Sequence, residues 1–278
     1  MPVIKTGDIE QYYEENGSGE PIVFIHGGLV SHLMWKPQVE HFSCRYRTIT
    51  YDIRGHGLTG GSGRKDYTVE LFAEDMRALL DALSLDRPVI CGLSLGGMIA
   101  QAFATRHPDR LKALVLSDTA ISTVMTPADK LQTYTLGWSL LPAIRIMGVK
   151  NFVAYAFWMA KLTRGDKWLG LNPGVRDYVR KEMLSINKDE MVKIYGAILK
   201  FRMQDLASVR VPTLITCGEF ESANVTGQAG IMCRLIPDAR MVSVPGGGHT
   251  SSMESPAEYN RVVEEFLNGL RRGDDDHK

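Results

Sequence analysis

The pattern Gly92-Leu93-Ser94-Leu95-Gly96 constrains the fold of this chain more than any other feature. The apolar run just before it predicts a buried strand, and the apolar residues after it return on a helical period, at Ile99, Ala102 and Phe103. Glycine on both sides leaves no Cβ where the strand and helix backbones approach closely, so Ser94 can adopt a strained backbone with an exposed hydroxyl. We therefore expect a strand, a sharp turn and a helix, with Ser94 as the candidate nucleophile.

Composition excludes several other classes of protein. The chain has 278 residues, 44% hydrophobic and 23% charged, with Lys plus Arg equal to Asp plus Glu at 32 each. This balance favours a small, largely neutral ligand over nucleic acid or anionic lipid. We find neither an N-terminal signal nor the run of ~18 apolar residues of a membrane helix, and expect a cytoplasmic protein without a membrane partner. Cys44, Cys91, Cys217 and Cys233 lack metal-like spacing and are expected to be buried reduced thiols.

Over most of the chain, short apolar runs alternate with segments in which apolar residues recur at helical spacing. Strands are expected at 22–25, 46–52, 89–91, 111–116, 211–218 and 240–244, after an opening antiparallel hairpin around the turn at 16–19. Thr68 is expected to cap an amphipathic helix, and another should run from Pro256 through Phe266. Because strands and helices alternate, the sheet should be mostly parallel with right-handed crossovers.

The alternation stops between about Ala120 and Asp205, where aromatic residues follow a helical period. We expect a helical insertion here. The predicted organisation is core at 1–119, a helical cap at 120–206, core again at 207–270, and a charged, disordered tail at 271–278.

The ordered motifs resemble the α/β-hydrolase superfamily. They are His26-Gly27-Gly28, the stretch 52–57 (Asp-Ile-Arg-Gly-His-Gly), Gly92 to Gly97, the strand ending at Gly218, and Gly248-His249. The resemblance implies an α/β-hydrolase fold with a mostly parallel eight-stranded sheet, flanking helices and a helical cap. Within this superfamily, the motifs resemble most those of small esterases and lactonases of the enol-lactone or acyl-homoserine-lactone hydrolase type.

The resemblance assigns roles in the chain order nucleophile, acid, base. Ser94 is the expected nucleophile, and His249 the general base. The backbone N–H groups of Gly28 and Leu95 are the expected oxyanion donors, with Leu29 as the alternative to Gly28. Of the other histidines, His26 and His56 belong to loop-shaping motifs, whereas His32, His41, His107 and His277 lie in segments that we interpret as surface.

The acid departs from the family pattern. Relatives usually show Gly-x-x-Asp after this strand, but here the stretch is Gly218-Glu219-Phe220-Glu221. Glu221 takes the expected slot and can orient the imidazole if the backbone retreats by one methylene. Asp118 is the alternative acid, and Glu219 is interpreted as a loop anchor.

The predicted activity is that of a serine hydrolase acting on a small, largely apolar carboxylic ester or lactone through an acyl-enzyme on Ser94, without cofactor or metal. Alternatives are a carbon–carbon bond hydrolase, a proline iminopeptidase-like peptidase and a non-catalytic small-ligand receptor of the same fold. The chain is expected to be a monomer or homodimer. The cap should cover Ser94 and set substrate choice, with pocket residues Leu29, Tyr134, Trp138, Phe157 and Trp158.

Overall fold

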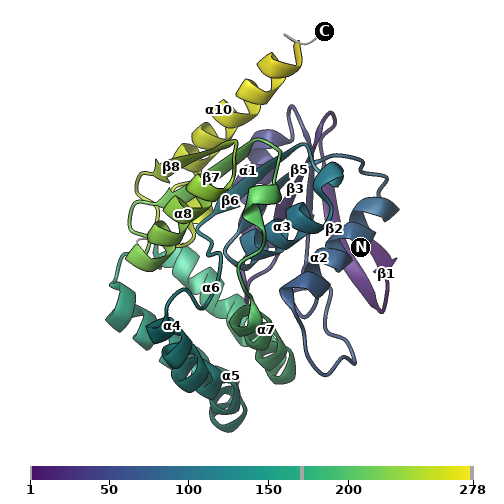
Figure 1. Ribbon diagram of the computed structural model, residues 1–278. Helices are drawn as coiled ribbons and strands as arrows, with labels where there is room; N and C mark the ends of the chain where they lie inside the picture. The colour runs from purple at the N-terminus through teal and green to yellow at the C-terminus, as the bar shows by residue number, and fades with distance from the viewer. Residues whose placement is uncertain (1, 170–171, 276–278) are drawn as a thin grey trace.

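The computed structural model describes residues 2–169 and 172–275. Its core is an eight-stranded sheet in the order β1-β2-β4-β3-β5-β6-β7-β8 (Figure 1). The strands are β1 (Val3–Thr6), β2 (Ile9–Asn16), β3 (Pro21–Ile25), β4 (Arg47–Tyr51), β5 (Val89–Leu93), β6 (Ala113–Ser117), β7 (Thr213–Gly218) and β8 (Ala239–Val244). From β4 to β8 every neighbouring pair is parallel, and β1 and β2 add an antiparallel edge. The predicted mostly parallel sheet is confirmed.

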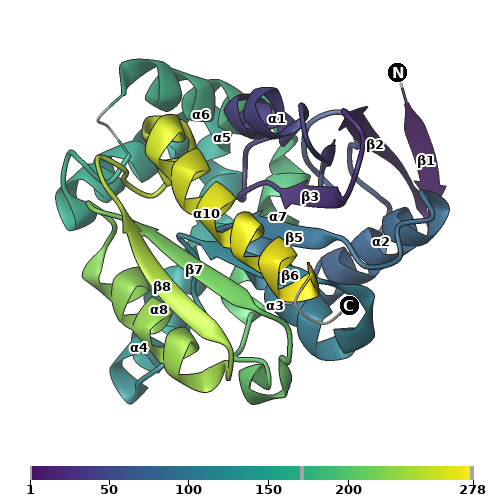
Figure 2. The same cartoon turned by 90° about the horizontal axis from the view of Figure 1, so that it is seen from above.

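Helices cover both faces of the sheet, with α1 and α10 on one face and α2, α3 and α8 on the other (Figure 2). The core helices are α1 (Lys36–Phe42), α2 (Val69–Ala82), α3 (Leu95–Arg106), α8 (Ala223–Leu235), α9 (Ser251–Glu254) and α10 (Pro256–Asp275), with short turns η1 (His32–Trp35), η2 (Pro108–Arg110) and η4 (Leu206–Ser208). Thr68 caps α2 as expected, because its side chain accepts a hydrogen bond from the Leu71 N–H. The central strands β5 and β6 are buried along their whole length, which explains their unbroken apolar sequence.

The insertion between β6 and β7 is helical. It contains α4 (Pro127–Gln132), the π-helical turn η3 (Thr133–Gly137), α5 (Trp138–Arg164), α6 (Pro173–Ser185) and α7 (Lys188–Lys200). Figure 1 shows α4, α5, α6 and α7 gathered at one end of the molecule, away from the chain's C-terminus, with α5 outermost. α5 is interrupted at Gly148, whose φ of 73° and ψ of 161° are not helical.

Four expectations about elements and burial are wrong. The opening hairpin turns between β1 and β2, at Gly7 with φ 63°, and not at 16–19, which instead joins β2 to β3. Residues 271–275 continue α10, so the predicted tail is helical there; its last three residues lie outside the described chain. Cys44 is exposed and Cys233 half-buried, whereas Cys91 and Cys217 are buried as expected.

The fourth wrong expectation is that no segment is long and apolar enough for a membrane helix. The helical stretch Thr133–Arg164 is long and apolar enough to cross a membrane by length and composition alone, with a mean hydropathy of 1.3 in its most apolar window. A core helix of a soluble protein can pass the same test, but only 17% of this window is buried. Most of the apolar surface in this window of α5 therefore does not pack inside the protein.

Candidate active site

Ser94 occupies a sharp turn between β5 and α3. Its φ of 53° and ψ of −113° are unusual for a residue with a side chain. A Cβ on Gly92 would collide with the Gly96 carbonyl, and one on Gly96 would collide with the Ile25 carbonyl. The two glycines therefore allow the close approach of strand and helix that holds Ser94 in this strained conformation.

A chain of hydrogen bonds joins Ser94, His249 and Glu221. Ser94 Oγ lies 3.1 Å from His249 Nε2, and His249 Nδ1 lies 2.5 Å from Glu221 Oε2. The histidine comes from the loop after β8 and the glutamate from the loop after β7, so all three side chains meet at the carboxyl edge of the sheet. This is the arrangement of a nucleophile, a base and the acid that orients the base.

Burial and charge act together on this pair. The Glu221 side chain is fully buried, and burial alone would raise its pKa, but the charge of His249 and the hydrogen bonds it accepts lower that pKa below the usual range. Burial likewise lowers the pKa of His249, but the neighbouring Glu221 carboxylate outweighs it and raises the pKa above its ordinary value. Glu221 is therefore ionised when His249 takes up a proton.

Asp118 is close to the same centre but has different partners. Its Oδ1 accepts the Gly218 N–H at 2.7 Å, and its Oδ2 accepts the Ser251 hydroxyl at 2.5 Å. Burial, followed by the charge of Glu221, raises the pKa of Asp118. Asp118 therefore lies between β7 and the His249 loop. Among these carboxylates, the hydrogen bond from the His249 imidazole goes to Glu221. Glu219 accepts the Gly246 N–H at 3.0 Å and so anchors the same loop.

The expected oxyanion donors lie next to each other. A Cβ on Gly28 would be 3.6 Å from the Leu95 Cβ and 3.4 Å from Cδ1 of Ile198 in α7. Leu95 is the first residue of α3, where an N–H has no partner within the helix. Leu29, the alternative donor, is buried with φ 66°. Gly28 therefore lies next to Leu95, the residue that follows Ser94, and the two remain the predicted oxyanion donors.

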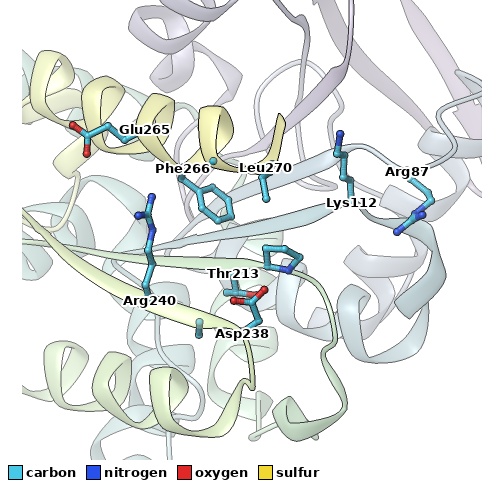
Figure 3. A pocket seen from close by; sticks show the side chains of 11 residues that line it. Arg87, Lys112, Thr213, Asp238, Arg240, Glu265, Phe266 and Leu270 are labelled. Atoms are coloured by element: carbon cyan, nitrogen blue, oxygen red, sulfur yellow. The ribbon is translucent and has the colours of Figure 1, made fainter. Parts of the chain in front are cut away.

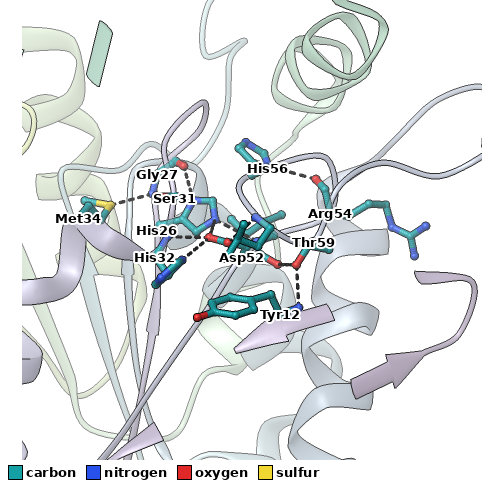
Figure 4. Close-up of polar contacts among 12 residues, drawn as sticks. Tyr12, His26, Gly27, Ser31, His32, Met34, Asp52, Arg54, His56 and Thr59 are labelled. Atoms are coloured by element: carbon teal, nitrogen blue, oxygen red, sulfur yellow. Dashed lines mark hydrogen bonds and ion pairs between the residues drawn. The ribbon is translucent and has the colours of Figure 1, made fainter. Parts of the chain in front are cut away.

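The loop that carries Gly28 rests on a buried polar network (Figure 4). The Ile53 N–H donates to His26 Nε2 at 3.0 Å, so Nδ1 carries the proton and donates to the Gly27 carbonyl at 2.7 Å. Asp52 accepts from both the backbone N–H and the ring of His32, at 2.7 and 2.9 Å. The surface assignment of His32 is therefore wrong: the ring is buried because Asp52 offers it a partner.

Two cap residues that the sequence analysis missed contact the core near Ser94. The Trp168 indole N–H donates to Glu221 Oε1 at 2.7 Å, and its ring stacks on His249 with centroids 4.6 Å apart. The Tyr178 hydroxyl lies 3.2 Å from both the hydroxyl and the carbonyl oxygen of Ser31, just after the Gly28 loop. Both are aromatic residues in an aromatic-rich insertion, and no local pattern separates them from core residues.

Leu29, the first of the predicted pocket residues, lies in the core loop after β3, and the other four are spread over the cap. Phe157 and Trp158 line a cavity of about 360 Å³ that also reaches Trp168. Charged side chains of α6, Arg176 and Arg180, line the same cavity, so its wall is less apolar than expected. Trp138 is half-buried, while the Tyr134 side chain is 53% exposed.

A second, open groove of about 860 Å³ lies at the opposite edge of the sheet (Figure 3). Its lining includes Thr213 and Ala239, the first residues of β7 and β8, so it is far along the strands from Ser94. It mixes the cations Arg87, Lys112 and Arg240 with Asp238 and Glu265, a lining that selects no single class of ligand. Among the described residues there is no group of three or more His, Cys, Asp or Glu side chains that could hold a metal.

Comparisons with known proteins agree with this geometry. Residues 20–256 match the family described as alpha/beta hydrolase fold. The chain is 26% identical to a putative carbamate hydrolase, RutD, of Azorhizobium caulinodans, over 95% of this chain and 97% of the relative, and 26% identical to 3-oxoadipate enol-lactonase 1 of Acinetobacter baylyi, over 90% and 89%. A thermophilic esterase from Thermogutta terrifontis has a TM-score of 0.84 at 25% identity, covering 97% and 99% of the two chains. The chain belongs to the α/β-hydrolase-fold family and is a hydrolase of this fold.

Proposed function

We propose that the protein hydrolyses a small, largely apolar carboxylic ester or lactone through an acyl-enzyme on Ser94. The observation that carries this proposal is the hydrogen-bonded series Ser94, His249 and Glu221. Gly28 and Leu95, the expected oxyanion donors, lie next to each other. A serine, a base, an oriented acid and two oxyanion donors are the parts that acyl transfer requires.

In the first half of the reaction, Ser94 Oγ attacks the carbonyl carbon while His249 Nε2 accepts the hydroxyl proton. The carbonyl oxygen becomes negative, and the Gly28 and Leu95 N–H groups stabilise it. When the tetrahedral intermediate collapses, the bond to the leaving oxygen breaks and His249 returns the proton to it. Glu221 stabilises the imidazolium throughout, since it stays ionised beside it.

In the second half, water replaces the alcohol. His249 accepts a proton from the water as the water oxygen attacks the acyl carbon, and then donates it to Ser94 Oγ as the acid product leaves. For a lactone, the alcohol and the acid remain one molecule. No step needs an oxidant, a reductant or a further co-reactant.

The substrate class is supported by the cap and by the relatives. The cap cavity is lined on one side by Phe157 and Trp158 and on another by charged residues of α6, and it reaches Trp168, which stacks on His249. Proteins similar to this chain are named as an esterase, an enol-lactonase and a carbamate hydrolase. All three act on a carbonyl carbon that bears a heteroatom leaving group.

The test combines turnover with trapping. We expect Ser94→Ala to lower kcat/KM on p-nitrophenyl esters at least about a hundredfold at an unchanged melting temperature, because the nucleophile supplies the covalent path and not the core. Acid quenching of the wild type with p-nitrophenyl acetate should add one acetyl group to the peptide that contains Ser94. If Ser94→Ala kept more than about a hundredth of the activity, Ser94 would not be the nucleophile.

The substrate panel separates the alternatives. It should contain p-nitrophenyl esters of several chain lengths, an acyl lactone, an aryl carbamate and a vinylogous 1,5-diketone for carbon–carbon cleavage. A receptor would bind one of these compounds without turnover or acylation. A carbon–carbon hydrolase would turn over the diketone fastest.

A further inference from the structure

The outer side of α5 exposes a large apolar surface, which we call the α5 face. Its members are Ile146, Met147, Tyr155, Trp158 and Leu162, with exposed fractions of 84%, 37%, 36%, 58% and 66%. Tyr155, Trp158 and Leu162 are spaced i, i+3 and i+7, so they form one stripe along the second half of the helix. Phe152 and Val153 point inward and are buried. The α5 face therefore lies on the side of α5 opposite Phe152 and Val153, and Trp158 at its border also lines the cavity next to α6.

Charge is distributed unevenly around this face. Between residues 131 and 165 the chain has four basic residues and no acidic ones, although the whole protein has as many acids as bases. Arg145, Lys150 and Lys161 are exposed, and Arg145 and Lys150 flank the break in α5 at Gly148. Lys161 is paired with Asp166 at 3.0 Å, which leaves Arg145 and Lys150 as the main positive charges beside Ile146 and Met147.

We propose that the α5 face binds an anionic lipid surface, with α5 lying in the plane of the interface. A helix that exposes Trp, Leu and Ile, with cations beside them and no acids, has the composition of an interfacial helix. Anionic lipid attracts such cations, while the apolar side chains enter the headgroup region. The break at Gly148 and the buried Phe152 and Val153 argue against α5 spanning the bilayer.

A second copy of the chain is the competing occupant. In a two-fold symmetric dimer the same patch meets itself, so the cations beside the α5 face would be brought toward their own copies. Charge complementarity therefore favours lipid. The expectation of no membrane partner rested on finding no long apolar run and on the balanced net charge of the whole chain, and that balance conceals the local excess of positive charge on α5.

The experiment is co-sedimentation with vesicles of phosphatidylcholine, with and without phosphatidylglycerol. We expect binding only where phosphatidylglycerol is present. Arg145→Gln with Lys150→Gln should weaken it about fivefold for each cation removed, and added salt should weaken it further. Ile146→Glu with Leu162→Glu should weaken it at least about tenfold.

The matched control is Val3→Glu with Leu58→Glu, which adds the same charge at exposed apolar residues of the core and should bind like the wild type. A thermal melt of every variant reports folding, and the Arg145 and Lys150 pair remains informative if the glutamate pair fails to fold. Ser94→Ala should still bind vesicles, so failure of this proposal and failure of the proposed hydrolysis are distinguishable.

Equal binding of wild type to both vesicle types, or full binding by the α5 variants, would overturn the proposal. So would a dimer in sedimentation equilibrium that Ile146→Glu with Leu162→Glu dissociates, without vesicle binding by the wild type. That last result would assign the α5 face to a second copy.

Discussion

Two buried carboxylates lie near His249, and their hydrogen bonds separate their roles. Glu221 accepts from the imidazole, whereas Asp118 accepts from Gly218 and Ser251. We expect Glu221→Gln to lower kcat strongly, because the amide favours the wrong imidazole tautomer; in the serine proteases the equivalent change costs about 10⁴-fold. Steady-state kinetics on one ester measures the loss.

Asp118→Asn is the matched comparison. It should leave kcat within about threefold and lower the melting temperature, because one buried donor, from Gly218 or Ser251, loses its acceptor at a cost of about 1–3 kcal/mol. The opposite result, an inactive Asp118→Asn beside an active Glu221→Gln, would transfer the acid role to Asp118.

The pH dependence of kcat/KM gives an independent test of the same residue. His249 must be neutral to accept the Ser94 proton, so activity rises with pH through the pKa of His249. The charged groups that act on or respond to this ring are Glu221, Asp118, Glu254 and Arg164. Because the Glu221 carboxylate raises the pKa of His249, the residual activity of Glu221→Gln should have its acidic limb at lower pH than wild type. A limb at unchanged pH would show that Glu221 does not act on His249.

At the scale of elements, the cap contacts His249 through Trp168, which lies in the segment after α5. Trp168 contributes three contacts: its carbonyl accepts the His249 N–H at 2.7 Å, its indole donates to Glu221, and its ring stacks on the imidazole. A Cβ on Gly248 would collide with the Trp168 carbonyl, so the His249 loop and the cap pack backbone to backbone. Trp168 is therefore a positioning residue for the base and the acid.

We expect Trp168→Phe to lower kcat about tenfold with little change in KM, since it keeps a stacking ring but loses the hydrogen bond to Glu221, worth about 1.5–3 kcal/mol for a charged acceptor. Trp168→Ala should lose more, because the imidazole also loses the ring that fixes its plane. The two variants separate the hydrogen bond from the stacking. A purely structural role would lower the melting temperature of both and leave kcat at wild-type values.

Local patterns predicted the elements better than the contacts between them. The elbow at Ser94 and the loop at His249 could be read directly, because glycine spacing is a local requirement of close backbone approach. The burial of His32 could not, because it depends on Asp52, twenty positions away in the chain. For the same reason Trp168 and Tyr178 were indistinguishable from other aromatic residues of the insertion. The hairpin turn was misplaced because the stretch at 16–19 has stronger turn composition than Gly7-Asp8.

At the scale of the whole molecule, the core holds the proposed catalytic residues and the cap contacts the core close to them. The cap touches the core on both sides of Ser94: Trp168 contacts the base and acid, and Tyr178 contacts the loop of the oxyanion donors. Ile198 of α7 reaches the Gly28 backbone. If these contacts enclose a bound substrate, we expect the cap to exclude water from it, which would strengthen the oxyanion hydrogen bonds.

The last prediction concerns substrate choice. If the cap determines substrate choice, changing a cap side chain near Trp168 or Gly28 should change the ranking of substrates and not only the rate. Phe157→Ala enlarges the cavity beside Trp168, and Ile198→Ala enlarges the space beside Gly28, so each should favour longer acyl chains over acetate. We expect a shift of about 10-fold in the ratio of kcat/KM values, the size of one or two methylene groups in an apolar pocket.

The measurement is kcat/KM across p-nitrophenyl esters from acetate to decanoate, with Leu184→Ala as control, an exposed cap residue on α6. The control should keep the wild-type ranking because its side chain already contacts solvent. An unchanged ranking in Phe157→Ala and Ile198→Ala, with only a lower melting temperature, would make the cap a scaffold. Substrate choice would then have to come from the core residues around Ser94.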